Sequence, residues 1–249
     1  MKTTLRILRN PPCGGTNDNA LKTLMHNLGK SGVDDEPLSI RDILEVGRSA
    51  HYAIWALRAV YGYECAKRLL AARLARQVYH LAKDDRAIAT ILSAEKFARG
   101  GISYDELNRS GGHAWAMLVE ATYADAVEEA EREIAIARNP QDKTLLVGKT
   151  LWEDSRNAKV AAMKAVGATT MYLAHDAAEY VARDVETAAK WMRVRGVTGL
   201  EKAKEAIKAR DEVSALISRE LLHLLDNLEH GRVDGCHKMV DYSQFINRG

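Results

Sequence analysis

One stretch of the sequence carries residues of the types and spacing that could hold a metal ion. In the segment ELLHLLDNLEH, Glu220, His223, Asp226 and His230 follow at intervals of three or four residues, so a helix would place them roughly along one side. Carboxylates and imidazoles are ligands for zinc, iron and manganese. A di-iron four-helix bundle needs two Glu-x-x-His motifs and two further glutamates, whereas this chain contains one such motif. The pattern is therefore more typical of a solvated polar stripe.

A second cluster could supply a general base. The segment YLAHDAAEY places His175 and Glu179 four residues apart with Asp176 beside them, and a histidine next to carboxylates can accept a proton from a substrate. An ion pair within a helix, or a histidine satisfied inside the core, explains the same spacing and is the interpretation we favour. An alternative function is that of a metal-dependent helical enzyme, which would use His175, Glu220 and His223.

The sequence contains no Gly-x-Ser-x-Gly elbow, dinucleotide fingerprint or kinase motif, so we expect no cofactor and no catalytic residues. The three cysteines, Cys13, Cys65 and Cys236, are far apart and odd in number, which suits a reducing cytoplasm better than a disulfide framework. The N-terminal residues scatter charges among apolar positions, unlike a signal peptide, and the longest charge-free apolar stretch, residues 165–174, is too short to span a bilayer. We expect a soluble cytoplasmic protein with no membrane partner.

Charge is balanced overall but segregated along the chain. The 36 basic and 34 acidic side chains leave a net charge of +2, which argues against a nucleic-acid partner. Residues 120–133 hold six acidic residues and one arginine, and residues 190–210 hold seven basic residues and two glutamates. Such segments could steer an oppositely charged protein, or they could face each other inside the fold or be solvated. If they contact a partner, the residues we expect to do so are Arg193, Arg195, Lys202 and Arg210, followed by Glu128, Glu129 and Glu133.

The elements that must position these residues are helices. Four prolines in 249 residues, and many good helix formers, predict an all-α fold: a multi-helix bundle of mostly antiparallel helices with a long C-terminal helix. Gly100 supplies a left-handed helix end, and Ser103 and Glu106 have the spacing of a capping box for the next helix. Further helix breaks are expected at Gly111–Gly112, Gly148 and Gly167, and a further capping box at Thr198 and Glu201. The expected organisation is an N-terminal extension with a short helix (1–36), an alanine-rich helical bundle (37–196), a long helix packed on the bundle or on a partner (197–231), and a tail (232–249).

Two apolar seams predict close helix packing. The first could pair within the chain or across a homodimer, and its members are Met171, Ala174, Ala178, Val181, Val185, Ala188 and Met192. The second follows the long C-terminal helix from Leu200 through Ile207, Ile217 and Leu221 to Leu228. The four tryptophans are dispersed, and we expect each of them to lock a helix interface rather than recognise a ligand: Trp55, Trp115, Trp152 and Trp191.

A family resemblance rests on residues of the central region. They are Cys65-Ala66, Asp85-Arg86 and Phe97-Ala98-Arg99-Gly100, followed by Ser103 and Glu106, with the Ala/His-rich segment MYLAHDAAEYVA further on. Over roughly residues 40–190 the chain resembles a family of immunity proteins, which are all-helical and occur beside bacterial toxin genes and in phage genomes. Residues 1–36 and the helix after Gly196 depart from the pattern of the family.

The resemblance brings no catalytic motif and implies a protein that binds another protein and blocks it. The resulting expectation is a non-enzymatic, protein-binding inhibitor that neutralises a toxin or a host defence complex, as an immunity or anti-CRISPR-like protein does. It would act by occluding or displacing a component of its target.

Overall fold

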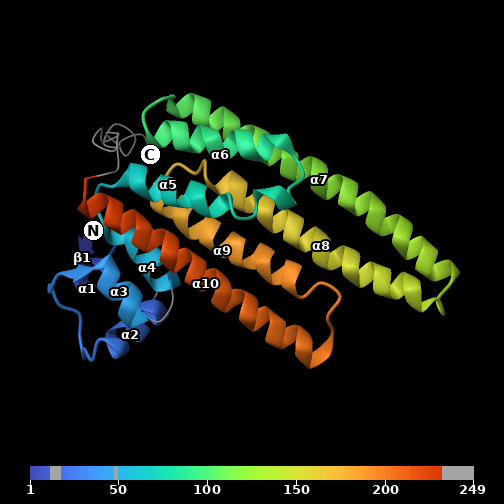
Figure 1. Ribbon diagram of the computed structural model, residues 1–249, viewed down its shortest axis with the longest axis horizontal. Coiled ribbons are helices and arrows are strands. Elements are labelled where there is room, and N and C mark those ends of the chain that lie inside the picture. The colour runs from blue at the N-terminus through green and yellow to red at the C-terminus, as the bar shows by residue number, and fades with distance from the viewer. Residues whose placement is uncertain (12–17, 48–49, 232–249) are drawn as a thin grey trace.

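The computed structural model describes residues 1–11, 18–47 and 50–231, and within them the chain is almost entirely helical (Figure 1). The expected all-α fold and the long C-terminal helix are confirmed. Lys2–Thr3 (β1) and Leu38–Ser39 (β2) pair in a short antiparallel ribbon. The α-helices of the described residues are α1 (Leu5–Arg9), α2 (Asp18–Asn27), α3 (Ile40–Gly47), α4 (Ala50–Ala56), α5 (Glu64–Ala75), α6 (Asp85–Ala98), α7 (Tyr104–Arg138), α8 (Lys143–Ala168), α9 (Ala174–Arg193) and α10 (Gly199–Glu229). No described helix is long and apolar enough to cross a bilayer.

Helix α9 is the centre of the bundle, since it packs against α5, α8 and α10. The seam predicted along it is buried from Ala174 to Ala188, and the small side chains let neighbouring backbones come close. Because α8 and α5 cover this face, the seam pairs within the chain rather than across a dimer. Met192, at the end of the seam, is 40% exposed.

The N-terminal residues belong to the same core as the rest of the chain. Leu5, Leu8 and Leu24 are fully buried and join one hydrophobic cluster that extends to Leu225 on α10. The described parts of the N-terminal region, residues 1–11 and 18–36, therefore contribute to the common core, and α2 packs against α3. The predicted tail, residues 232–249, lies outside the described residues.

Helix α10 buries its apolar side only from Ala209 onward. Val213, Ile217 and Leu221 are buried, but Leu200 and Ile207 are 73% and 53% exposed. The predicted apolar seam is therefore wrong for the first part of the helix, because that part extends past the ends of its neighbours (Figure 1). The side chain of Thr198 makes no capping hydrogen bond, so the capping box expected there does not form.

The turn between α6 and α7 has the predicted structure. Gly100 has a φ of +74°, and the backbone N–H of Gly101 donates to the carbonyl of Lys96 at 2.8 Å. The Ser103 backbone N–H donates to Glu106 Oε2 at 2.8 Å, while the Glu106 N–H donates to Ser103 Oγ at 3.2 Å. This capped turn starts the 35-residue helix α7, which forms an antiparallel hairpin with α8. The far end of the hairpin extends beyond the other helices (Figure 1).

Helices α7 and α8 are continuous at the glycines where breaks were expected. Gly111 and Gly112 lie inside α7, and Gly148 and Gly167 lie inside α8. At Gly111 the absence of a side chain permits close packing, since a Cβ there would lie 2.6 Å from Thr170 Oγ1. A Cβ on Gly112 would meet no atom within 4 Å.

The two adjacent glycines of α7 should respond to alanine with opposite signs. Gly111→Ala should lower the free energy of unfolding by about 1–3 kcal/mol, because the new methyl group forces Thr170 to move. Gly112→Ala should raise it by about 0.5–1 kcal/mol, because alanine restricts the unfolded chain and favours helix. Urea denaturation of both variants measures the difference, and equal effects would contradict the packing described here.

The corner between α8 and α9 is held by a buried arginine. Arg68 of α5 is 1% exposed and donates to the carbonyls of Thr169, Met171 and Tyr172 at 2.8, 2.8 and 3.0 Å. These carbonyls follow the end of α8, where helix carbonyls have no partner within the helix and the dipole is negative. The guanidinium also lies 5.2 Å from the centre of the Phe97 ring. Arg68 thus links α5, α6 and the α8–α9 corner.

Replacing this arginine should destabilise the whole fold. Arg68→Met should lower the free energy of unfolding by about 3 kcal/mol or more, because three carbonyls lose their donor inside the core. Arg73→Met is the matched control on the same helix: Arg73 contacts exposed His223, so its loss should cost less than about 1 kcal/mol. Urea denaturation of the two variants decides the question, and similar losses would show that Arg68 has no special role.

Cys65, near the start of α5, is disulfide-bonded. The expectation that the cysteines remain as free thiols is therefore wrong at this position. Cys13 and Cys236 lie outside the described residues.

Candidate functional site

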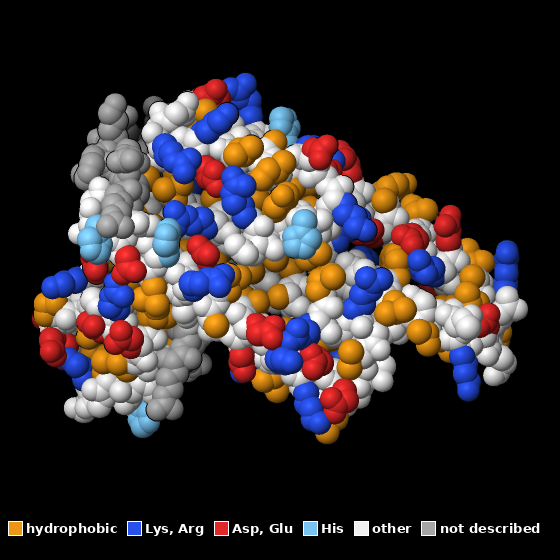
Figure 2. Space-filling model, viewed as in Figure 1, with side chains coloured by type: hydrophobic (Ala, Val, Ile, Leu, Met, Phe, Trp, Pro, Cys, Tyr) orange, Lys and Arg blue, Asp and Glu red, His pale blue; other side chains and the backbone are white. Residues whose placement is uncertain are grey.

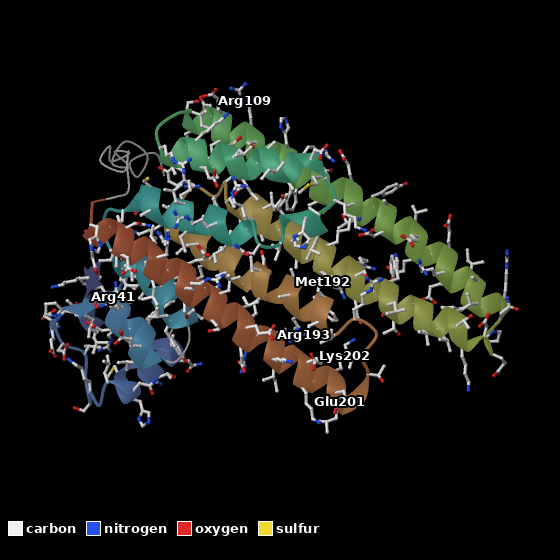
Figure 3. All side chains as sticks on the ribbon, viewed as in Figure 1. Arg41, Arg109, Met192, Arg193, Glu201 and Lys202 are labelled. Atoms are coloured by element: carbon white, nitrogen blue, oxygen red, sulfur yellow. The ribbon has the colours of Figure 1, made fainter. Side chains whose placement is uncertain are left out.

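The residues of the candidate metal site serve as surface contacts of α10. His223 Nδ1 lies 2.8 Å from Arg73 Nη1, and Asp226 pairs with Arg41 of α3 at 2.7 Å, beside the C-terminal end of α10 (Figure 3). His230 is exposed and its Nδ1 contacts a backbone carbonyl of its own helix. Across the described part of the chain, no three His, Cys, Asp or Glu side chains gather in an arrangement that could hold a metal ion. The structure therefore does not bring Glu220, His223 and His175 together as one site.

His175 is a buried histidine of the α9 N-terminus. It is 5% exposed, and burial, reinforced by the nearby Lys67 ammonium, lowers its pKa to about 4. Lys67 is itself 1% exposed and donates to the Val60 carbonyl at 2.6 Å and to Glu64 at 2.8 Å. Glu179, the expected helical partner, instead pairs with Arg58. His175 is therefore a buried histidine, but it is not the satisfied core histidine expected from the sequence. Its Nε2 atom has no hydrogen-bond partner among the described residues and lies 3.5 Å from Asp176 Oδ1.

The acidic residues of α7 are mostly neutralised by their neighbours. Asp125 pairs with Lys159 at 3.1 Å, Glu129 pairs with Arg156 at 2.6 Å, and Glu133 pairs with Lys149, all three cations being on α8. Glu120 pairs with Arg86 of α6 at 2.6 Å, and Glu128 pairs with Arg132 one turn along α7 at 2.6 Å. Residues 120–133 therefore mostly compensate charges of α8, α6 and α7 itself, and no ion pair joins them to residues 190–210 among the described residues.

The basic segment is also largely paired inside the molecule. Arg193 binds Glu205 at 2.8 Å and Glu212 at 2.6 Å, and Lys202 binds Asp154 of α8 at 3.0 Å (Figure 3). Arg210 lies 3.3 Å from Asp211, with both side chains largely exposed. Arg195 makes no ion pair with any described residue. Of the seven charged contact candidates, then, six have an intramolecular partner among the described residues, and these are Arg193, Lys202, Arg210, Glu128, Glu129 and Glu133.

A row of apolar side chains faces the solvent along α7. The outer face of α7, as we call it, consists of Trp115, Val119, Tyr123, Val127 and Ile134, which are 47–75% exposed. Their spacing of four, four, four and seven residues keeps them on one side of the helix, opposite the buried side chains of Leu107, Ala114 and Leu118. Figure 2 shows hydrophobic side chains along the edge of the molecule that α7 forms.

The outer face of α7 was not anticipated from the sequence. Trp115 is 66% exposed, so the expectation that every tryptophan locks a helix interface is wrong there, although Trp55 is 5% exposed as expected. The sequence did carry a usable pattern, since α7 has apolar residues on two opposite sides of one helix. When one of those sides packs on a bundle, the other has no partner within the chain.

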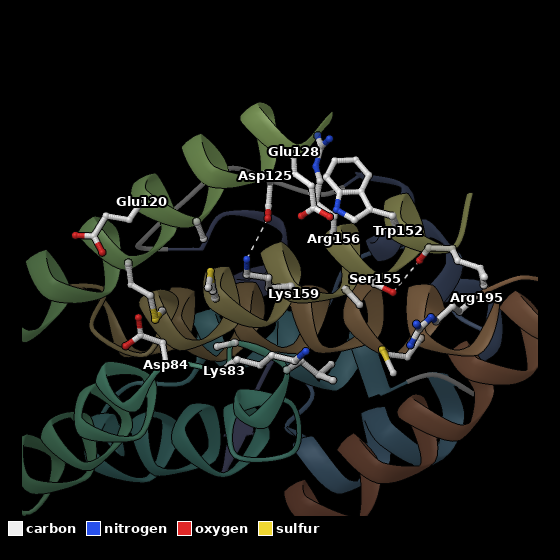
Figure 4. Close-up of a pocket in the computed structure, with 18 of the residues that line it drawn as sticks. Lys83, Asp84, Glu120, Asp125, Glu128, Trp152, Ser155, Arg156, Lys159 and Arg195 are labelled. Atoms are coloured by element: carbon white, nitrogen blue, oxygen red, sulfur yellow. Dashed lines mark hydrogen bonds and ion pairs between the residues drawn. The ribbon is translucent and has the colours of Figure 1, made fainter. Parts of the chain in front are cut away.

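A trench lined by described residues runs over α8. The α8 trench, as we call it, has a volume of about 680 Å³. One wall is α7, and the other is formed by the turn before α6 and the end of α9 (Figure 4). Trp152 of α8 lies between Arg132 and Arg156, whose guanidinium carbons are 5.4 and 5.3 Å from the centre of its ring. Lys83 and Arg195 lie on the wall opposite α7 (Figure 4).

No protein-family model matches the sequence, and comparison with curated proteins and with solved structures gave no significant match.

The buried histidine should make the protein sensitive to acid. Its pKa is lower in the folded than in the unfolded chain, so only the unfolded chain takes up a proton between pH 6.5 and pH 4. The stability due to neutral His175 is therefore complete above pH 6.5 and is lost as the pH falls to about 4, by at most about 3 kcal/mol. Urea denaturation at pH 7.5 and 4.5 measures this loss, which should shrink in His175→Gln and persist in His26→Gln, a change at an exposed residue of α2. Equal acid sensitivity in all three proteins would refute the assignment.

Proposed function

We propose that this chain is a non-enzymatic binding protein that blocks another protein, and that the outer face of α7 is its main contact surface. The single observation that carries the proposal is the exposed apolar row from Trp115 to Ile134 on a helix that projects from the bundle. Large solvent-facing apolar rows are rare on proteins that bind nothing. Trp115 and Tyr123 are the residue types that most often dominate binding energy.

The form of this surface favours one mode of recognition. It is a convex helix face rather than a groove, so the complementary partner has an apolar groove that receives one side of a helix. Such grooves accept apolar side chains spaced four residues apart along a helix. The outer face has this spacing, with aromatic anchors at Trp115 and Tyr123 and valines at Val119 and Val127. A partner whose groove is filled in this way cannot use it for its own target, which is inhibition by occlusion.

The charged residues around the outer face have a supporting role in this proposal. Ion pairs from α7 to α8 hold the hairpin in one shape, so the apolar row is presented without the entropy loss of ordering a loose helix. Paired surface charges contribute little affinity but still influence the approach of a charged partner. Arg193, Lys202 and Glu133 therefore suit steering better than anchoring.

The nature of the target follows from the resemblance to immunity proteins. On that basis the blocked protein is a toxin or a component of a defence complex, and the gene would be carried beside the toxin or on a phage or other mobile element. Neither a cofactor nor a nucleic acid enters the proposed mechanism.

Two matched double variants test the contact surface. Trp115→Ser with Tyr123→Ser should weaken binding to the purified partner by about 100-fold or more, since each anchor contributes about 2 kcal/mol or more. Leu200→Ser with Ile207→Ser removes exposed apolar side chains from α10 instead and should leave the affinity unchanged. The partner is obtained by affinity capture from the native host, and calorimetry gives affinity and stoichiometry.

The purified partner, the wild-type chain and the α7 double variant also test inhibition. Titrating the partner with the wild-type chain should abolish its activity at one equivalent, and the α7 double variant should fail to do so at equal folding stability. Turnover of a small molecule by the chain alone would overturn the proposal. So would sedimentation showing a homodimer that the Trp115 and Tyr123 changes dissociate, because the outer face would then be a self-contact.

A further inference from the structure

The α8 trench has its own chemistry, separate from the outer face of α7. None of the five residues of the outer face lines the trench, because they point to the opposite side of the helix. Its volume of about 680 Å³ lies in the range of sites that hold small organic molecules. The trench can therefore be occupied whether or not α7 binds a partner.

The charges of the trench leave an excess of two cations. Ten charged side chains line it, six basic and four acidic. Four of the basic groups are paired: Arg86 with Asp84 and Glu120, Lys159 with Asp125, Arg132 with Glu128, and Arg156 with Glu129. Lys83 and Arg195 are the remaining two, and neither forms an ion pair with any described residue.

The positions of these two cations are set by the backbone around them. Lys83 has a φ of +52°, a left-handed conformation that is uncommon for a residue with a side chain, and it directly precedes Asp84, which caps α6. Arg195 follows the end of α9 and precedes Gly196, whose N–H is 3.3 Å from Asp154 Oδ2. In Figure 4 the ends of Lys83 and Arg195 point toward each other along the wall opposite α7.

Apart from these charged groups and Ser155, the lining of the trench is mainly apolar. Met117 and Met163 are buried beneath it, Met192 lies at its α9 end, and Leu151 and Ala158 belong to its lining. Methionine side chains adapt to the shape of an apolar guest. A guest that fits this lining has an apolar body in addition to a charged group.

We propose that the α8 trench binds a small amphiphilic organic anion, with its acid group between Lys83 and Arg195 and its aromatic or aliphatic body on the methionines. The acid group, a carboxylate, sulfonate or phosphate, forms charge-assisted hydrogen bonds with the two cations. Burial of the body supplies the remaining binding free energy. An inorganic anion lacks this second contribution and binds more weakly.

The probe for this site is 8-anilinonaphthalene-1-sulfonate, with N-phenyl-1-naphthylamine as the same molecule without the acid group. The sulfonate should bind one equivalent of the full-length chain with a saturable rise in fluorescence. Lys83→Gln with Arg195→Gln should weaken it by about tenfold or more, because two charge-assisted contacts are lost. The uncharged naphthylamine should bind both proteins equally.

Two control variants locate the probe. Lys22→Gln with Arg138→Gln makes the same change in net charge at exposed positions outside the trench and should alter the affinity less than about twofold. Trp115→Ser with Tyr123→Ser should keep sulfonate binding intact, which separates this proposal from the function proposed for α7. Unchanged binding in the Lys83 and Arg195 variant, loss of binding in the α7 variant, or no saturable binding would each overturn the trench assignment.

Discussion

The fold depends on the buried guanidinium of Arg68. A guanidinium presents several N–H groups in a fixed plane, and here they meet three carbonyls at the corner where α8 turns into α9. Desolvating a cation is costly unless its hydrogen bonds are satisfied, so this corner has one well-defined geometry. Helix α8 is the floor of the trench and the partner of α7. The placement of both candidate surfaces therefore follows from the position of a corner that contacts neither of them directly.

Internal charge pairing decides which surfaces remain for binding. The hairpin of α7 and α8 is rich in charge, yet its acids and bases mostly neutralise one another across the helix pair. One side of α7 then presents an apolar row, and on the other side a trench contains two cations, Lys83 and Arg195, that form no ion pair with a described residue. The two surfaces differ in shape and chemistry because one is a convex helix side and the other a concave space between helices.

Local chemistry was predictable from the sequence, and long-range contacts were not. The Gly100 turn and the box of Ser103 and Glu106 follow from residues a few positions apart, and the structure contains both. The breaks expected at Gly111 and Gly112 do not occur, because Gly111 serves a contact with Thr170 that spacing alone does not reveal. The ion pairs of the charged candidates could not be predicted for the same reason, since the partners of Lys202 and Glu133 lie on a different helix, α8. The spacing of apolar residues along α7 indicates two apolar sides, but only the packing of the helix determines which of them faces the solvent.

The length of α7 has a geometric consequence for any protein that accepts its outer face. From Trp115 to Ile134 the helix advances by 19 residues, or roughly 28 Å at 1.5 Å each. A receptor contacts both ends of this apolar row at once only if its binding site has a similar length. A shorter receptor would leave one end hydrated and gain only part of the attraction. The length of the binding site alone can therefore distinguish between similar receptors, independently of individual side-chain contacts.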